Sequence, residues 1–521
     1  MTYSVENSKS DEGSKIRWEL VPFFRGRVLD MPSGNYKTFP HFIWADHRKQ
    51  IGKIVPDVWI ETQAKLDLFS SQSFDCVFSC HLLQHIEDYK LALREWWRVV
   101  KPGGYLCLYL PHKDLCPLEY GGRKAKHHLL PIDITKAMLE SGRFDLIENQ
   151  IRNEEDEFSF FQVYRKLEKN QALESWADQK PGKTAAVVRY GAFGDMIQAS
   201  SIFPGLKAQG YHLTVYCSAA GYDVVKHDPH VDRFIIQDKD DVPPQFLSEF
   251  WNYTRKKYDK WVNLSESVEC TLLAAADRVN HEWPDAVRAK YMDRNYIEWT
   301  HELAQVPPPY QPMFYSTVEE KAWARKTAER WGRRNIVWSL SGSSVHKTWP
   351  HLDLIIDRII NTYRDTHIVL VGDDLCRILQ AGWDRYDERL DKWIDVHPQV
   401  HCKSDIWTIR QSMAFCEAAD LIIGTETGLL NAAGSMNTPK IVTLSHSSKE
   451  MLTKHWQKVI ALEQPAGVGC PKAPCRQLHF DWTHCMKHEE TGTALCQYYI
   501  DPDMMWHAIV SVLGESQRKA A

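Results

Sequence analysis

The chain has 521 residues, of which 44% are hydrophobic and 25% charged, a composition typical of a soluble folded protein with room for about three domains. A formal net charge of -5 argues against a broad nucleic-acid-binding surface, although a local basic groove remains compatible with it. No apolar run is long enough to cross a membrane, and the polar N-terminus lacks the apolar core of a signal peptide. We therefore expect a cytoplasmic protein without a membrane span.

Apolar, strand-like runs alternate with helix-like segments along the whole chain, which predicts α/β domains with mainly parallel sheets. The first set of strands is expected at residues 27–31, 74–80, 104–111 and 158–167, with a Pro-Gly-Gly turn at 102–104. The second set is expected at residues 184–190, 212–218, 233–238 and 260–265. The third set is expected at residues 335–342, 367–374, 420–428 and 440–445. The fold class predicted is thus three Rossmann-like domains.

Polar and proline-rich stretches mark the expected boundaries between these domains. Residues 168–183 are polar and end in Pro-Gly, which is typical of a linker, and four prolines within 305–313 separate the second set from the third. The predicted organisation is a flexible tail at 1–20, a first domain at 21–167, a linker at 168–183, a second domain at 184–325 and a third domain at 326–521.

In the first domain, acidic residues follow the predicted strands at positions suited to a nucleoside. Asp30 ends the first strand, and Gly34 lets the backbone turn closely around a ligand. Asp46 ends the second strand, where a carboxylate can accept both ribose hydroxyls, and Asp67 precedes the strand at 74–80, where it can meet an adenine amino group. These residues predict a nucleoside-containing cofactor at this edge of the sheet.

Residues 27–112 resemble class I S-adenosylmethionine-dependent methyltransferases, most specifically in "HLLQHIED…EWWRVVKPGGYL". The resemblance implies S-adenosylmethionine held by Asp30, Gly34, Asp46 and Asp67. The family usually has two or three glycines after the first strand, whereas only Gly34 stands here. That departure leaves a second interpretation open, in which the domain is non-catalytic and serves docking or stability.

The stretch "VVRYGAFGDMIQ" opens the second domain with a strand, a glycine turn and a helix that begins near Asp195. An aspartate at a helix N-terminus is explained by capping alone. The glycines are explained less well by capping, because Gly191 and Gly194 keep the approach to Asp195 open. With Arg189, these residues form a polar cluster at the carboxyl end of a parallel strand, where open α/β sheets bind ligands.

The third domain contributes two further polar segments after its predicted strands. "SLSGSSVHKTWP" places Ser343, Ser344 and Lys347 where hydroxyls and an ammonium suit diphosphate oxygens. "GTETGLLNAAG" places Thr427 and Gly428 at the start of a helix of small residues, which predicts an anion site. Together with the Asp195 segment, these patterns predict a phosphate-containing ligand between two domains.

The three segments "RYGAFGDMIQASSIFPGLK", "GSSVHKTWP" and "ADLIIGTETGLLNAAGSMNTP" resemble the heptosyltransferase group of glycosyltransferases (family 9). The likeness extends from Thr184 to Ser511 and implies a GT-B pair of Rossmann-like domains facing across a cleft. By this resemblance Asp195 is the general base of an inverting transfer from a nucleoside-diphosphate sugar, and Lys347 stabilises the leaving diphosphate. The implied donor site comprises Arg189, Gly194, Ser343, Ser344, Glu426, Thr427, Gly428 and Asn431.

Two departures from the family leave the sugar open, since the family usually has Asp at position 426 and His at position 431. The expected acceptor is a glycan or another hydroxyl compound, and the fusion suggests glycosylation and methylation of one acceptor. The alternatives are a methyltransferase with a GT-B recognition module, a glycosyltransferase acting on modified nucleic acid, a non-enzymatic scaffold, or another two-domain Rossmann protein such as a nucleotide-sugar epimerase.

A late cysteine cluster at residues 470–496 contains Cys470, Cys475, Cys485 and Cys496. Four thiols this close in a protein expected to be cytoplasmic indicate a metal site before disulfides, although no C-x-x-C pair occurs. His479 and His484 are alternative ligands. The heptosyltransferase resemblance implies iron, and zinc suits the same thiols, in a structural site with no open position. Free cysteines are the alternative interpretation.

Overall fold

The structure is a computed structural model and describes residues 12–32, 37–50, 55–116, 125–153, 157–167, 182–237, 241–276 and 278–514. The chain forms two compact units. The first comprises residues 1–181 with 236–257, and the second comprises residues 182–235 with 258–521. Among the described residues, no helix is both long and apolar enough to cross a membrane.

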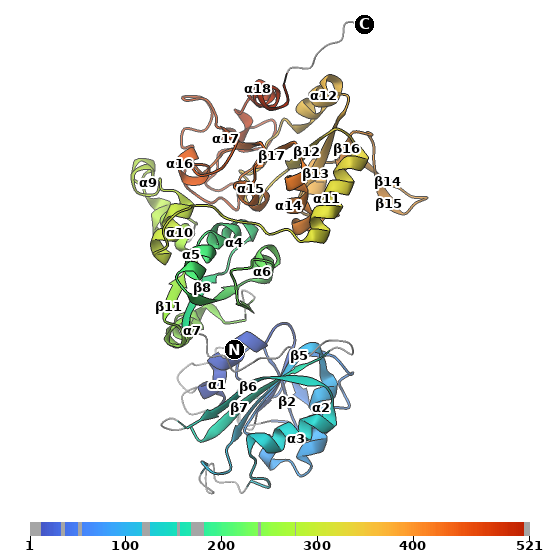
Figure 1. The fold of residues 1–521 in the computed structure, drawn as a ribbon, viewed down its shortest axis with the longest axis vertical. Helices are drawn as coiled ribbons and strands as arrows, with labels where there is room; N and C mark the ends of the chain where they lie inside the picture. Colours follow the sequence, from blue (N-terminus) through green and yellow to red (C-terminus); the bar gives the residue numbers. More distant parts are fainter. Residues whose placement is uncertain are drawn as a thin grey trace. The chain divides into compact units, whose positions relative to one another are not determined.

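The first unit is built on a seven-stranded sheet in the order β3-β2-β1-β4-β5-β7-β6. Strands β1 to β5 are parallel, and β7 and β6 continue the sheet antiparallel. Its strands are β1 (Val28–Pro32), β2 (Ile43–Asp46), β3 (Val58–Trp59), β4 (Phe74–Cys80), β5 (Val100–Pro111), β6 (Phe144–Arg152) and β7 (Ser159–Lys166). Its α-helices are α1 (Glu12–Leu20), α2 (Tyr89–Val99), α3 (Pro131–Ser141) and α7 (Pro244–Thr254). Helices α2 and α3 lie side by side against the sheet (Figure 1).

Helix α7 belongs to this unit although it comes late in the chain, because its apolar face packs on α1. The Trp18 ring lies 5.8 Å from the ring of Phe250. Glu19 accepts hydrogen bonds from Tyr253 Oη at 2.7 Å and from Lys257 Nζ at 2.5 Å. Helix α1 therefore occupies residues that the sequence analysis assigned to a flexible tail, and the buried Trp18 and Glu19 explain why it is fixed.

Residues 102–104, where the sequence predicts a Pro-Gly-Gly turn, do not separate a helix from a strand. Residues 102–104 lie inside β5, where Gly103 adopts a positive φ of 78° and the register against β4 shifts between Phe74 and Cys76. A bulge of this kind needs a residue that tolerates the left-handed region, which glycine does. The expected linker at 168–183 lies outside the described residues except for its last two positions.

The second unit contains two further sheets. Its N-terminal half (residues 182–235 and 258–317) has a four-stranded sheet in the order β10-β9-β8-β11, in which β8 pairs in parallel with β9 and β11. The strands are β8 (Lys183–Arg189), β9 (Tyr211–Cys217), β10 (Arg233–Ile236) and β11 (Lys260–Asn263). The helices are α4 (Phe193–Ser200), α5 (Phe203–Ala208), α6 (Ala219–Val225), α8 (Ser267–Thr271), α9 (Asp285–Tyr291) and α10 (Tyr296–Ala304).

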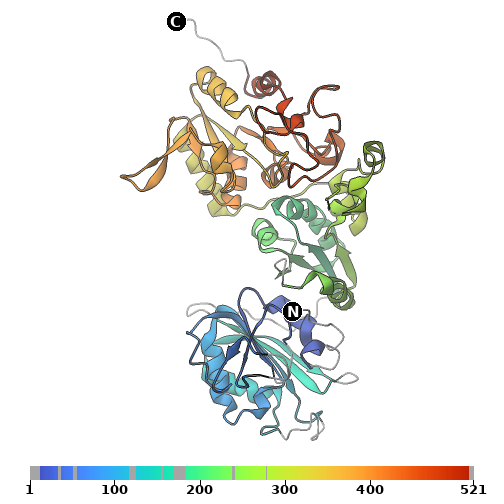
Figure 2. The ribbon, with the colours of Figure 1, turned by 180° about the vertical axis from the view of Figure 1, so that it is seen from behind.

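The C-terminal half (residues 318–514) has a six-stranded, wholly parallel sheet in the order β16-β13-β12-β17-β18-β19. The strands are β12 (Arg334–Ser339), β13 (Thr366–Val371), β16 (Val400–Cys402), β17 (Leu421–Thr425), β18 (Lys440–Thr443) and β19 (Val459–Leu462). The helices are α11 (Val318–Trp331), α12 (Leu352–Thr362), α13 (Cys376–Leu379), α14 (Ile409–Ala418), α15 (Gly428–Ala433), α16 (Lys449–Leu452), α17 (Leu495–Tyr498) and α18 (Pro502–Leu513). A separate antiparallel hairpin, β14 (Asp384–Asp387) with β15 (Lys392–Asp395), projects from this half (Figure 2).

The three Rossmann-like sheets confirm the predicted fold class, because each is parallel where the sequence showed apolar runs alternating with helices. The two halves of the second unit share one apolar core. It includes Val187 and Ile197 of the N-terminal half together with Val337 and Leu430 of the C-terminal half. This continuous core packs the halves against each other, and the cleft expected of a GT-B pair lies beside it.

A loop of the C-terminal half also bonds directly to the N-terminal half, and we call it the 475–478 bridge. The amide of Ala274 donates to the carbonyl of Arg476, and the amide of Leu478 donates to the carbonyl of Ala274, each at 2.9 Å. The Arg288 guanidinium donates to the carbonyl of Cys475 at 3.1 Å. The start of the cysteine cluster is therefore fixed to the opposite half of the unit.

Candidate functional site

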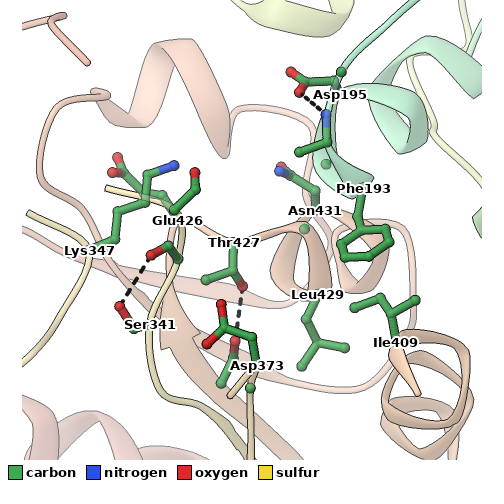
Figure 3. Close-up of a pocket in the computed structure, with 18 of the residues that line it drawn as sticks. Phe193, Asp195, Ser341, Lys347, Asp373, Ile409, Glu426, Thr427, Leu429 and Asn431 are labelled. Carbon is green, nitrogen blue, oxygen red and sulfur yellow. Dashed lines mark hydrogen bonds between the residues drawn. The ribbon is translucent and has the colours of Figure 1, made fainter. Parts of the chain in front are cut away.

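A cavity of about 1120 Å³ lies between the two halves of the second unit. The N-terminal half contributes the turn at 191–195 and part of α8, and the C-terminal half contributes the loops after β12, β13, β17 and β18. These loops all follow the carboxyl ends of parallel strands, the edge at which such sheets bind ligands. Figure 3 shows Lys347 and Glu426 next to each other on the C-terminal half, with Asp195 contributed by α4.

Asp195 is both a helix-capping residue and a cavity residue. Its Oδ2 accepts a hydrogen bond from the amide of Ala192 at 2.8 Å, which closes a capping box at the start of α4. Its side chain remains 27% exposed and lines the cavity. A Cβ added at Gly191 would lie 2.6 Å from the Asp195 side chain, so a glycine is needed there. The capping interpretation is therefore correct, and it leaves the carboxylate accessible.

A buried guanidinium joins Asp195 to a second carboxylate that the sequence analysis missed. Arg189 Nη2 donates to Asp195 Oδ1 at 2.5 Å and to Glu269 Oε1 at 2.9 Å, while Nη1 donates to Glu269 Oε2 at 3.1 Å. Arg189 is only 2% exposed and does not line the cavity, whereas Glu269 does. The structure therefore places Arg189 behind Asp195, as a support for the carboxylate.

Two glycines let the halves meet beside Asp195. A Cβ added at Gly428 would lie 2.9 Å from Cβ of Phe193 and 3.0 Å from the amide nitrogen of Gly194. A Cβ added at Gly194 would lie 2.6 Å from Nδ2 of Asn431. The starts of α4 and α15 are thus in close contact, and Gln198 Nε2 donates to Asn431 Oδ1 across the interface at 3.3 Å.

Lys347 and Glu426 form the charged part of the cavity on the C-terminal half. Burial lowers the pKa of Lys347, and the carboxylates of Glu426 and Asp195 offset part of that effect. Burial raises the pKa of the Glu426 carboxyl, but His446, Lys347 and Ser445 together lower it to about 2. Glu426 is therefore a carboxylate at neutral pH, only 5% exposed and facing Lys347.

The other predicted donor-site residues divide into cavity residues and supporting ones. Ser343, Thr427, Gly428 and Asn431 line the cavity with Gly194. Thr427 caps α15 and pairs with Ser339 Oγ at 3.1 Å. Ser344 is buried and does not line the cavity.

Further cavity residues come from loops for which the sequence analysis assigned no role. His446 follows β18, Asp373 follows β13, and Trp407 precedes α14. The signal that could have found Asp373 and His446 is their position just after predicted strands. Trp407 lines the cavity, whereas Trp338 and Trp349 are buried in the core.

In the first unit, Asp46 is the last residue of β2, as predicted, whereas Asp30 is the middle residue of the neighbouring parallel strand β1, which continues to Pro32 instead of ending at Asp30. Asp46 is fully buried and is held by Arg48, whose Nε and Nη2 donate to its carboxylate at 3.0 and 2.7 Å. Asp67 is exposed, and Gly34 lies outside the described residues. The Asp46 carboxylate at the end of β2 suits the ribose of a nucleoside, but a ribose reaches it only if the Arg48 side chain moves.

The structure does not bring the four sulfurs of the late cysteine cluster together as one set of metal ligands. Among the described residues, no three of these cysteines form a group of converging ligand atoms. Burial raises the pKa of the Cys475 thiol to about 12 and of the Cys485 thiol to about 11, with Cys470 adding to both. Burial and all three other thiols raise the pKa of Cys496 as well. Cys475 Sγ lies 3.5 Å from Nε2 of His479. The metal site predicted from the spacing of the cysteines is therefore not preformed.

A comparison of the sequence with protein families confirms the methyltransferase class of the first domain. Residues 43–108 match the family model of a methyltransferase domain. This stretch runs from β2 into β5 and lies within the resemblance expected at residues 27–112. No curated protein matches the chain.

Solved structures similar to the chain include three from the two expected classes. Escherichia coli ADP-heptose LPS heptosyltransferase II is 15% identical, covers 63% of this chain and 98% of its own, and has a TM-score of 0.43. The iron-containing dodecameric glycosyltransferase TibC of enterotoxigenic E. coli is 12% identical, covers 68% and 82%, and has a TM-score of 0.41. An S-adenosylmethionine-dependent methyltransferase of Mesorhizobium loti is 15% identical, covers 31% and 100%, and has a TM-score of 0.25.

Residues 43–108 are therefore similar to a methyltransferase domain, and the second unit consists of two halves, each with a Rossmann-like sheet, on either side of one cavity.

Proposed function

We infer that the second unit is an inverting glycosyltransferase that moves a heptose-like sugar from a nucleoside diphosphate to an acceptor hydroxyl. The observation that carries this proposal is the cavity itself, which places the Asp195 carboxylate of one half opposite Lys347 of the other. A base and a phosphate-binding cation on opposite sides of one cavity are what a direct displacement requires. The sequence resemblance to family 9 supports the same roles.

In this mechanism the acceptor oxygen attacks the anomeric carbon while the bond from that carbon to the diphosphate oxygen breaks. The hydroxyl proton passes to the Asp195 carboxylate, and the bonding electrons leave with the nucleoside diphosphate. Arg189 fixes one Asp195 oxygen, and the Ala192 amide fixes the other. The base is therefore oriented before the acceptor arrives.

The C-terminal half holds the donor in this proposal. Lys347 neutralises the charge that develops on the leaving diphosphate, and Ser343 and Thr427 offer hydroxyls to its oxygens. Glu426 lies near the sugar, with Asn431 on the side of α4. The exposed Asp373 follows the carboxyl end of β13, the strand beside β12, where a carboxylate suits the ribose of the donor nucleotide.

The test is stabilisation of the full chain by a panel of nucleoside diphosphates. A ligand present at 100 times its Kd raises the free energy of unfolding by about 2.7 kcal/mol if it binds only the folded protein. We expect one nucleoside diphosphate to raise the Tm of the wild type and to have little effect on Lys347→Ala. Lys392→Ala, an exposed lysine of the β14–β15 hairpin, is the matched control. No shift with any nucleotide would contradict the proposal.

A second function, methyl transfer, is favoured by the match of residues 43–108 to a methyltransferase domain. S-adenosylmethionine would supply the methyl group, and Asp46 at the end of β2, with Asp30 of β1 beside it, would hold its nucleoside. The same thermal assay with S-adenosylhomocysteine tests this site. Asp46→Asn should abolish the Tm shift. Asp67→Asn is the comparison, because Asp67 is exposed, whereas Asp46 is buried at the end of β2. A glycan or other hydroxyl compound is the expected acceptor for both reactions.

We also propose that Cys470, Cys475, Cys485 and Cys496 hold a structural iron or zinc ion. The closeness of the four cysteines in sequence supports this donor set, and binding of the ion would have to draw their sulfurs together. Such a metal would fix the long loop that contains the 475–478 bridge. Metal analysis of the purified full chain, with Cys470→Ser and Cys270→Ser compared, tests it, because Cys270 is an exposed thiol outside the cluster.

A further inference from the structure

Two imidazoles and a carboxylate meet at one edge of the six-stranded sheet. His346 follows β12, Glu426 follows β17 and His446 follows β18, and these three strands are neighbours in the sheet. Parallel strands deliver the loops that follow them to one edge, so residues far apart in sequence converge there. All three residues are buried, with exposed fractions of 1%, 5% and 3%.

The atoms that meet are ligand atoms. One nitrogen or oxygen of each of the three side chains lies within 4.8 Å of the others. Nε2 of His346 lies 3.0 Å from Nδ1 of His446, which lies 2.5 Å from Oε2 of Glu426. Two atoms bound to one metal ion at about 2.1 Å are separated by roughly 3 Å or slightly more. The separation of the two imidazole nitrogens matches this spacing, and the Glu426 carboxylate has to move away from His446 for an ion to enter.

Hydrogen bonds alone do not satisfy the three facing atoms of this group. If Nδ1 of His446 carries a proton, that proton faces two acceptors, Glu426 and Nε2 of His346. If the proton lies on Nε2 of His346, the lone pairs of His446 and Glu426 face each other at 2.5 Å. Neither placement of the proton gives each of the three facing atoms a partner of its own, which indicates that a further species completes the group.

We propose that His346, Glu426 and His446 bind a divalent transition-metal ion, such as Zn²⁺, Fe²⁺ or Mn²⁺, at the edge of the cavity. Imidazole and carboxylate ligands suit these ions, whereas the thiols of the cysteine cluster form a different donor set. Ser445 Oγ and the amide of Ser447 donate to Glu426 at 2.5 and 3.0 Å and so orient the carboxylate.

Three protein ligands leave coordination positions open, and the site has access to the cavity. Glu426 and His446 both line it, beside Lys347. An anionic oxygen of a bound ligand would fill an open position. Under the proposed glycosyltransferase function, on which this step rests, that oxygen belongs to the nucleoside diphosphate.

Cobalt spectroscopy on the metal-free full chain distinguishes this site from the cysteine cluster. Co²⁺ bound by imidazole and carboxylate gives visible ligand-field bands without the near-ultraviolet charge-transfer band that a thiolate ligand produces. We expect Co²⁺ to bind with visible ligand-field bands and without that thiolate band. The affinity for Co²⁺ at this site should fall at least about tenfold in His346→Gln, His446→Gln and Glu426→Gln. His401→Gln is the matched control, because His401 is a buried imidazole on β16, paired with His367 and outside the cavity.

Loss of the thiolate-free bands in the three ligand variants, with retention in His401→Gln and Cys485→Ser, would support the proposal. No Co²⁺ binding, or binding with only a thiolate band, would overturn it. Circular dichroism checks that each variant folds. If a histidine variant does not fold, Glu426→Gln, which keeps the side-chain size, provides the test. A spectrum unchanged by every nucleoside diphosphate would leave the metal site standing and overturn its link to the donor.

Discussion

Glu269→Gln is expected to lower kcat by leaving the Arg189 guanidinium to pair with Asp195 alone. Oδ1 of Asp195 and Oε1 of Glu269 bond to the same Nη2 of Arg189, so the two oxygens lie at most about 5.4 Å apart. Two unit charges at that separation repel each other by about 3 kcal/mol at an effective dielectric constant of about 20. The side chains are 27% and 26% exposed, and screening by water reduces the effect to about 1.5 kcal/mol.

In Glu269→Gln this repulsion is lost, and the remaining ion pair between Arg189 and Asp195 holds the Asp195 carboxylate more tightly. Because the carboxylate then reacts less readily with the acceptor hydroxyl, kcat at neutral pH should fall by roughly three- to tenfold. The KM for the donor should stay unchanged, because Lys347 and the other donor-binding residues belong to the opposite half.

The assay measures release of nucleoside diphosphate from the donor that stabilises the protein, from about pH 5 to about pH 9. Glu266→Gln is the control, since Glu266 lies on the same segment but pairs with Arg278. A kcat of Glu269→Gln that equals or exceeds that of the wild type would refute the reasoning. An equal loss of kcat in Glu266→Gln would refute it too, because the effect would then not depend on Arg189.

Three further predictions concern packing, the cofactor and pH. Gly428→Ala should destabilise the protein by about 1–3 kcal/mol and weaken nucleotide binding, because its Cβ would push α4 away from α15. Denaturation should show no such loss for Gly182→Ala, where the added Cβ meets nothing within 4 Å. Arg48→Ala should tighten S-adenosylhomocysteine binding about tenfold by freeing Asp46, and calorimetry showing weaker binding would contradict this. Burial lowers the pKa of Lys440 to about 8, below its unfolded value, so the folded protein loses this proton first. The wild type should therefore gain about 2 kcal/mol over Lys440→Met between pH 7 and pH 10, and an equal difference at both pH values would argue against it.

The parallel strands were predictable because most of their residues are apolar, as in β4, β13 and β17. A strand buried on both faces has no other reason for such a run. The β14–β15 hairpin was missed because its strands carry Asp384, Arg385, Asp387 and Lys392 and bury no apolar face in the core. Helix α1 was missed because its contacts with α7 come from residues more than 200 positions later.

The cavity was predictable only in part. Asp195 and Lys347 stand in local glycine- and serine-rich patterns, and such patterns are visible in the sequence. Glu269 has no local pattern, because its role depends on Arg189, 80 positions away, which turns both carboxylates toward one guanidinium. His346 and His446 likewise acquire meaning only when the strand order brings β12, β17 and β18 together.

The 475–478 bridge has a consequence for how the second unit uses its binding energy. Together with Tyr296, whose hydroxyl lies 2.7 Å from Ser447 Oγ, the bridge joins the halves by hydrogen bonds beside their shared apolar core. A wide opening of the cavity would have to break these bonds and expose that core to water. The base and the lysine are thus already held in register in the empty protein. Little of the free energy gained on binding is then consumed in bringing the halves together, and more remains for the transition state.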